Sequence, residues 1–218
     1  MACQGFGPPG SGLTRRRPAV ETWVACGGRQ LIAEPLDTRQ RQRRIRTARE
    51  FSNVTVRRST PQDTESFRRC LDAVARERKW LAFLQAPSLQ DVDTFLRQNS
   101  PIQFVAVQED EVVGWCDVTP NQREGFQHSG VLGMGLLVGF RGRGLGRTLL
   151  HETIDAALAA GLTRVELEVL ASNEPAVALY ERFDFTNEGR KRAARILDDR
   201  VEDILCMALV RPSERRAV

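Results

Sequence analysis

The chain has 218 residues, of which 41% are apolar and 28% are charged. This composition is typical of a folded globular protein and excludes a chain disordered throughout, a collagen-like fibre and a small disulfide scaffold. The five cysteines are scattered without a CxxC pair, and there are only two histidines. We therefore expect a reducing, cytoplasmic location and no metal site. We find neither a secretory signal nor an apolar run long enough to cross a membrane.

The first 50 residues differ in composition from the rest. Residues 1–53 hold ten arginines against four acidic residues, a net charge of +6, which leaves −2 for residues 54–218. Glycine, proline and arginine are dense, and no apolar periodicity persists, so we predict that residues 1–50 are a disordered basic extension. An arm that binds nucleic acid through residues 39–49 is the alternative. It is disfavoured because no aromatic residues lie between the arginines.

From residue 54 onward the hydrophobic pattern predicts regular elements. Residues 54–58 form a short predicted strand, and 61–80 a helix with apolar residues at helical spacing. A second helix is expected to begin after Ser88. Residues 103–108 and 111–119 have the character of two strands joined by a tight acidic turn, which indicates an antiparallel hairpin.

The second half of this region alternates between strands and helices. The expected strands are 130–138, 165–169, 185–190 and 200–210, and the expected helices are 145–161 and 173–183. No internal repeat is present. The order of elements predicts an α/β fold in which a mixed sheet carries helices on both faces.

A segment rich in glycine and arginine, residues 139–147, lies between an apolar strand and the helix that follows it. Glycines remove side chains where backbone amides must approach a ligand, and the first amides of a helix have no partner within it. The spacing excludes a Walker loop and differs from the dinucleotide fingerprint GxGxxG. We predict a pyrophosphate cradle with these glycines and arginines: Gly142, Gly144, Gly146, Arg141, Arg143 and Arg147.

Arg141-x-x-Gly144-x-Gly146, placed after an apolar strand, resembles the acyl-CoA signature of the GNAT superfamily of N-acyltransferases. Downstream, Asn173-Glu-Pro-Ala-Val-Ala-Leu-Tyr180-Glu-Arg-Phe-Asp-Phe185 is similar to the second motif of that family, N-x-x-A-x-x-LY-x-x-x-GF. Asp184 stands where the family usually has glycine, and we expect only a local adjustment because Asp tolerates positive φ. The resemblance covers about residues 54–210, which leaves 211–218 as a C-terminal tail.

The resemblance implies a GNAT-like fold of about six or seven mostly antiparallel strands and about four helices. It also implies that the chain uses acetyl-CoA as co-substrate. Backbone groups of the strand end at Leu136, Leu137 and Val138, together with Asn173, are then expected to hold the pantetheine arm. The amides of Arg141, Gly142, Arg143, Gly144, Leu145 and Gly146, with Arg147 nearby, are expected to hold the pyrophosphate.

The same resemblance implies direct attack of an amine on the thioester, which needs a base and an acid. Tyr180, the only tyrosine in the chain, matches the position expected for the acid that protonates the departing thiolate. The base is left open. The candidates are Glu168 and its neighbour Glu166, Glu77 near the end of the first helix, and His128 before the apolar strand.

We therefore expect an N-acetyltransferase that acts on a primary amine, with a small molecule such as an amino acid favoured as acceptor. A protein N-terminal or lysine acetyltransferase is the alternative within the same chemistry. Alternatives of another class are a CoA-binding sensor without turnover and a nucleic-acid-associated protein that uses the arginine-rich tail. No membrane partner is expected, and a homodimer is left open.

Overall fold

The structure is a computed structural model, and it describes residues 53–99 and 102–211. The expected extension at residues 1–50 and nearly all of the C-terminal tail lie outside these residues, so the predicted domain boundaries stay predictions. The described strands are β1 (Thr55–Arg58), β2 (Gln103–Gln108), β3 (Glu111–Pro120), β4 (Ser129–Leu136), β5 (Arg164–Leu170), β6 (Thr186–Leu197) and β7 (Arg200–Val210). The helices are α2 (Thr64–Arg76), α3 (Leu89–Asn99), α4 (Leu145–Ala159) and α5 (Glu174–Glu181), with 3-10 turns η1 (Pro61–Asp63) and η3 (Val138–Phe140).

The seven strands form one sheet in the order β1-β2-β3-β4-β5-β7-β6. Every neighbouring pair is antiparallel except β4 and β5, which run parallel. The order of helices and strands along the chain is the predicted one, and the predicted fold class, a mostly antiparallel mixed sheet with four helices, is confirmed.

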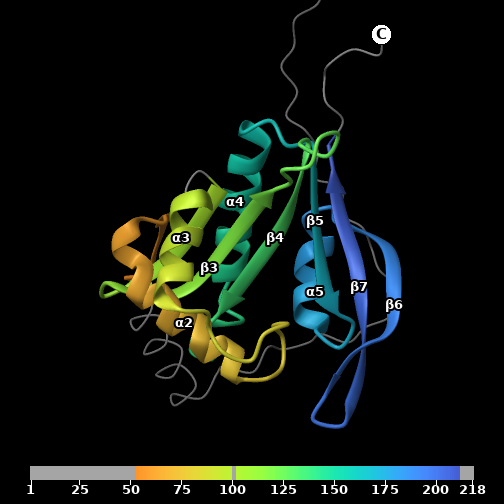
Figure 1. Cartoon of the computed structure of the whole chain (residues 1–218), viewed down its shortest axis with the longest axis horizontal. Helices are drawn as coiled ribbons and strands as arrows, with labels where there is room; N and C mark the ends of the chain where they lie inside the picture. Colours follow the sequence, from red (N-terminus) through yellow and green to blue (C-terminus); the bar gives the residue numbers. More distant parts are fainter. Residues whose placement is uncertain (1–52, 100–101, 212–218) are drawn as a thin grey trace, which may run out of the picture. The chain divides into compact units, whose positions relative to one another are not determined.

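Helices cover both faces of the sheet and build two apolar clusters (Figure 1). Helices α2 and α3 pack on one face, where Phe67 and Leu96 meet Trp115 of β3. Helix α4 packs on the other face, where Leu149 and Leu150 are fully buried in the larger cluster. Alternate residues of β3 serve the two clusters, as the twofold period of a strand requires.

Strands β4 and β5 separate soon after they begin. They pair only where Ser129–Val131 lies beside Arg164–Glu166, and beyond that they diverge toward their carboxyl ends (Figure 1). Helices α4 and α5 follow these two strands in sequence, so the amino end of each helix comes after the carboxyl end of its strand. The hydrogen-bonded sheet is therefore interrupted between β4 and β5 beyond Val131 and Glu166.

Three local details differ from, or refine, the prediction. Helix α2 ends at Arg76 instead of near Trp80, because Arg78 adopts φ +55° and cannot continue a right-handed helix. Strand β6 extends to Leu197, seven residues past the predicted end. The prediction stopped early because the arginine-rich second half of the strand lacks apolar alternation. Asp184 adopts φ +65°, which is the local adjustment expected at this position.

Candidate active site

The predicted cradle is a loop that turns from β4 into α4. Gly142 and Gly144 adopt φ +71° and +85°, a region that side chains disfavour, and Gly144 is the N-cap of α4. The amide of Thr148 donates to the carbonyl of Gly144, which is the first bond of the helix. The amides just before Thr148 are those that a helix leaves without an internal acceptor. Together with the helix dipole, they form a site suited to an anion.

Arg141 is engaged by the chain itself. Its Nε donates to the carbonyl of Leu136 at 2.8 Å, and its two terminal nitrogens donate to both carboxylate oxygens of Glu77 at 2.6 and 2.8 Å. Its amide donates to Val138 O at 3.4 Å. These bonds hold the loop against β4 and the end of α2. They also engage the carbonyls of Leu136 and Val138, two groups expected to meet the pantetheine arm.

Close packing explains the last glycine of the cradle. A Cβ on Gly146 would lie 3.2 Å from Leu136 Cδ1 and 3.5 Å from Leu179 Cδ2, so glycine lets the first turn of α4 approach both β4 and α5. Gly146 is buried, whereas Gly142 and Gly144 are exposed at the loop surface. The three glycines therefore have two different roles: backbone conformation at the first two and close approach at the third.

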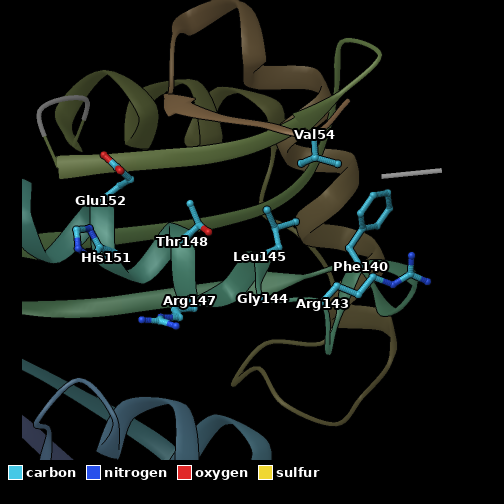
Figure 2. Close-up of a pocket in the computed structure, with 9 residues that line it drawn as sticks. All are labelled: Val54, Phe140, Arg143, Gly144, Leu145, Arg147, Thr148, His151 and Glu152. Carbon is cyan, nitrogen blue, oxygen red and sulfur yellow. The ribbon is translucent and has the colours of Figure 1, made fainter. Parts of the chain in front are cut away.

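An open hollow of about 540 Å³ adjoins the cradle on the outer side of α4. Figure 2 shows Thr148 and Glu152 on one side of the helix and Arg147 directed to the other. The hollow shares Arg143, Gly144 and Arg147 with the cradle but contains none of the predicted catalytic residues. Its lining residues are Val54, Phe140, Arg143, Gly144, Leu145, Arg147, Thr148, His151 and Glu152.

Asn173 is the N-cap of α5, but its side chain makes no capping hydrogen bond. The amides of Ala176 and Val177 both donate to its backbone carbonyl at 3.0 Å, so the helix begins without using the side-chain amide. The residue is half-buried and precedes α5, just beyond the carboxyl end of β5. Helix capping therefore does not use the side-chain amide, and the predicted role of Asn173 in binding the cofactor arm stays a prediction.

Tyr180 lies at the carboxyl end of α5 and is 6% exposed. Its ring packs against Phe185 with centroids 5.7 Å apart. Burial, and secondarily the nearby thiol of Cys116, raise the pKa of Tyr180 well above its usual range. The hydroxyl therefore keeps its proton throughout the neutral range. Cys116 is fully buried in the same cluster, and its burial raises the pKa of the thiol, which makes it unreactive.

The glutamates considered as bases are all paired within the chain. Lys191 of β6 donates to Glu168 Oε1, and Arg164 Nε donates to Glu166 Oε2 at 3.1 Å. The carboxylate of Glu77 holds Arg141. Leu167 of β5 is buried on the α4 side of the sheet. Glu166 and Glu168 lie on the opposite face, the one that α2 and α3 cover elsewhere in the sheet.

His128 is not brought to the other candidate residues. It is exposed just before β4 begins, and its carbonyl accepts hydrogen bonds from Thr163 and Arg164. The cradle follows the opposite end of this eight-residue strand. A strand advances about 3.3 Å per residue, so His128 lies more than about 20 Å from the cradle.

One carboxyl group that the sequence reasoning missed lies on β3. Asp117 is 5% exposed, and burial raises its pKa to about 7, opposed only by a hydrogen bond from the Thr119 hydroxyl. The sequence did hold a signal for this residue, because Asp117 is an acidic residue between the apolar Cys116 and Val118 of a predicted strand. Alternation alone does not distinguish such a residue from a solvated one.

The family model of the Acetyltransferase (GNAT) family matches residues 65–185, which include the cradle, Asn173 and Tyr180. The chain belongs to this family. Its fold agrees with that of a protein named yncA from Salmonella typhimurium, whose structure is described with its cofactor acetyl-CoA. The two share 16% sequence identity with a TM-score of 0.69, covering 76% of this chain and 98% of the other.

Two curated relatives are similar in sequence. One is the [ribosomal protein bS18]-alanine N-acetyltransferase of Escherichia coli strain K12, 40% identical over 70 residues, or 32% of this chain and 47% of that protein. The chain thus spans about half the length of this relative. The other is the L-amino acid N-acetyltransferase AaaT of the same strain, 24% identical over 165 residues, or 74% of this chain and 100% of that protein.

Two further properties concern the described part of the chain. Within residues 53–99 and 102–211, none of the helices is long and apolar enough to cross a membrane. In the same residues, no three side chains of His, Cys, Asp or Glu gather in a way that could hold a metal ion.

Proposed function

We propose that the chain transfers the acetyl group of acetyl-CoA to a primary amine. The observation that carries this proposal is the divergence of β4 from β5, with a glycine-rich helix start after one strand and the unused Asn173 amide after the other. In this proposal the acyl-thioester arm lies between the diverging ends of the two strands, and the anionic pyrophosphate lies at the amides before Thr148. Family membership supports the same co-substrate.

In this proposal acetyl-CoA supplies a thioester whose carbonyl carbon reacts with the amine. The chain supplies the rest. The amides from Gly142 to Arg147 bind the diphosphate, and the Asn173 side chain orients the arm. Tyr180 holds a proton for the sulfur, which is consistent with its burial and raised pKa.

The acceptor class we favour is an α-amino group carried by a small molecule such as an amino acid. The name of one curated relative supports this class, because that protein acts on L-amino acids and the similarity spans its whole length. An α-amine at a protein N-terminus is the second candidate. The relative with 40% identity over 70 residues favours it.

A thiol-release assay with acetyl-CoA tests the proposal. Wild-type protein is offered L-amino acids, polyamines, aminoglycosides and peptides that begin with alanine. Release of thiol that depends on an amine, with a product heavier by one acetyl group, supports an acetyltransferase. Binding of acetyl-CoA without release on any acceptor supports a sensor instead. Preference for alanine peptides over free amino acids would move the assignment to the protein-directed candidate.

A further inference from the structure

Asp117 is a buried carboxyl group without a cationic partner among residues 53–99 and 102–211. Its exposed fraction is 5%, the hydroxyl of Thr119 is its hydrogen-bond partner, and within the described chain no charged group contributes to its pKa of about 7. Burying a carboxylate without a cation is costly, and proteins retain such groups chiefly where a reaction uses them. Asp117 thus differs from Glu77, Glu166 and Glu168, each of which has an arginine or lysine partner.

The register of the sheet places Asp117 beside the gap. Asp117 lies opposite Gln103 of β2 on one side and Gly133 of β4 on the other. A Cβ on Gly133 would lie 3.2 Å from Asp117 Oδ1, so the missing side chain gives the carboxylate room over β4. Extending the β4–β5 register by two residues brings Gly133 level with Glu168, where the strands no longer pair. Asp117 and Glu168 therefore lie on the same face of the sheet, on strands at either side of β4.

Part of this face is exposed to solvent near Gly133. Val131, two residues before Gly133 and on the same face, is 49% exposed, so α2 and α3 do not cover this part of β4. Gln103, fully buried on the same face, accepts a hydrogen bond from Ser59 through Oε1, but its Nε2 is buried without a partner among the described residues. Buried donors are rarely left unpaired, so this amide is a second polar group beside Asp117 that the fold itself does not use.

The predicted acid, Tyr180 of α5, lies against the other face of β3, near Cys116. Cys116 precedes Asp117 and points to the opposite face, where its thiol is close enough to Tyr180 to affect that residue's pKa. The carboxyl group and the phenol are therefore near one another along the sheet but on opposite faces. An amine that enters from the α2 and α3 face would meet Asp117, and the sulfur on the α4 and α5 face would meet Tyr180.

We propose that Asp117 is the general base of the reaction and accepts a proton from the acceptor ammonium over Gly133. This inference rests on the proposed acetyltransferase function. The ammonium gives one proton to the Asp117 carboxylate, and its freed lone pair forms the C–N bond as the C–S bond breaks. Tyr180 donates its proton to the departing sulfur. The nitrogen then loses a second proton, and Tyr180 regains this proton through solvent. Asp117 then releases its proton to solvent, so one proton is produced in each turnover.

The test compares amines that do and do not need deprotonation. Wild type, Asp117→Asn and Glu168→Gln are assayed with acetyl-CoA and two probes: the best ammonium acceptor of the thiol-release panel, and hydroxylamine, which is largely uncharged at neutral pH. Asp110→Asn, the same chemical change at the exposed β2–β3 turn, is the control. Asn adopts the positive φ of Asp110 without strain.

We expect Asp117→Asn to lower kcat/KM for the ammonium acceptor by about 10²–10³-fold, since general base catalysis typically contributes 10²–10⁴-fold. The fall in rate below about pH 7, the pKa of Asp117, should be replaced by one that follows the pKa of the acceptor amine itself. The rate with hydroxylamine and the affinity for acetyl-CoA should change little. Gly133→Ala provides a second variant, because its Cβ intrudes on Asp117 and should raise KM for the acceptor without affecting acetyl-CoA binding.

Three outcomes with an active wild type would overturn the inference. Equal losses with both amines would show a structural role for Asp117. An unchanged acidic limb in Asp117→Asn, or its loss in Glu168→Gln, would place the base elsewhere. The pH profile must be read against the other groups near this face, namely Glu166 and Glu168 of β5 and Glu77 of α2, which are paired with Arg164, Lys191 and Arg141. If wild type transfers acetyl to neither amine, the proposed function fails and the inference fails with it.

Discussion

At the scale of single residues, most charge near the gap is compensated within the chain. Glu77 forms an ion pair with Arg141, and Glu168 forms one with Lys191. Tyr180 and Asp117 differ because burial, and not an ion pair, sets their pKa values. Groups whose protonation depends on desolvation are suited to proton transfer, since a substrate that enters the site changes their environment directly.

Tyr180→Phe removes the hydroxyl and keeps the ring that packs on Phe185. We expect kcat to fall about 10²-fold, at the low end for a general acid, because a thiolate is already a fair leaving group. Since burial raises the pKa of Tyr180, the wild-type rate should not fall at the usual tyrosine value of about 10. Measurement of kcat against pH for both proteins checks this. Wild-type rates in the variant would make Tyr180 a packing residue.

The charge of the cradle is tested best at Arg147, which is exposed on the first turn of α4. A negative charge at a helix N-terminus opposes the binding of an anion, so Arg147→Glu should weaken acetyl-CoA binding about tenfold or more. Arg147→Gln should show a smaller loss. Calorimetric titration with acetyl-CoA measures both. Gly144→Glu is a poorer test, because the φ of +85° there would add backbone strain to the charge effect. Equal affinities in all three proteins would place the diphosphate elsewhere.

At the scale of elements, the end of α2 is a junction between distant parts of the chain. Glu77 holds the cradle through Arg141, and the next residue, Arg78, donates to both carboxylate oxygens of Asp198 at the tip of the β6–β7 hairpin. Arg195 of β6 donates to the carbonyls of Arg78 and Lys79. The hairpin tip is thereby attached to α2, across the face on which we place the acceptor.

Breaking the link between α2 and the cradle should affect both stability and binding. Glu77→Gln removes a charge-assisted pair that is only partly exposed, so we expect the free energy of unfolding to fall by about 1–2 kcal/mol. Acetyl-CoA affinity should fall as well, because Arg141 then holds the loop less firmly. Urea unfolding and calorimetric titration measure the two effects. Glu65→Gln, at an exposed position of the same helix, is the control and should change neither.

At the scale of the whole molecule, Asp117 gives stability a distinctive pH dependence. In the folded protein its pKa is raised from the ordinary value to about 7. Its contribution to the free energy of unfolding is therefore fully present below pH about 4 and is lost as the pH rises through about 7. Asp63 has the opposite effect. Burial alone would raise the pKa of Asp63, but the hydrogen bonds from Arg57 and Thr60 lower it below the ordinary Asp value. The stability that Asp63 contributes is therefore present above the ordinary Asp pKa and is lost in acid.

The difference between wild type and Asp117→Asn isolates the first effect. We expect the variant to gain stability relative to wild type as the pH rises from about 5 to about 8, at about 1.4 kcal/mol for each unit of pKa shift that is titrated. Urea unfolding at several pH values measures this difference. A constant difference across the range would show that Asp117 is ionised at its ordinary pKa and is not desolvated.

Local chemistry along the chain was enough to predict the order of elements and the cradle. Glycines at fixed spacing after an apolar strand specify a tight loop and a helix start wherever they occur, and positive φ at Gly142 and Gly144 follows that logic. Periodicity likewise placed α4 and β5, because burial of one face repeats along a single element. Where such a signal was weak, as in the second half of β6, the predicted strand ended too early.

The partners of each charged residue were decided only by the tertiary structure. Glu77 and Arg141 are 64 residues apart, and no local pattern predicts that they meet. The same holds for Asp117, whose burial depends on strands β2 and β4 on either side of it, and for the separation of β4 from β5. Ion pairing and desolvation depend on which elements lie together in space. The sequence alone therefore determined the class of chemistry, whereas the fold decided which carboxyl groups are paired and which one, Asp117, is buried without a cation among the described residues.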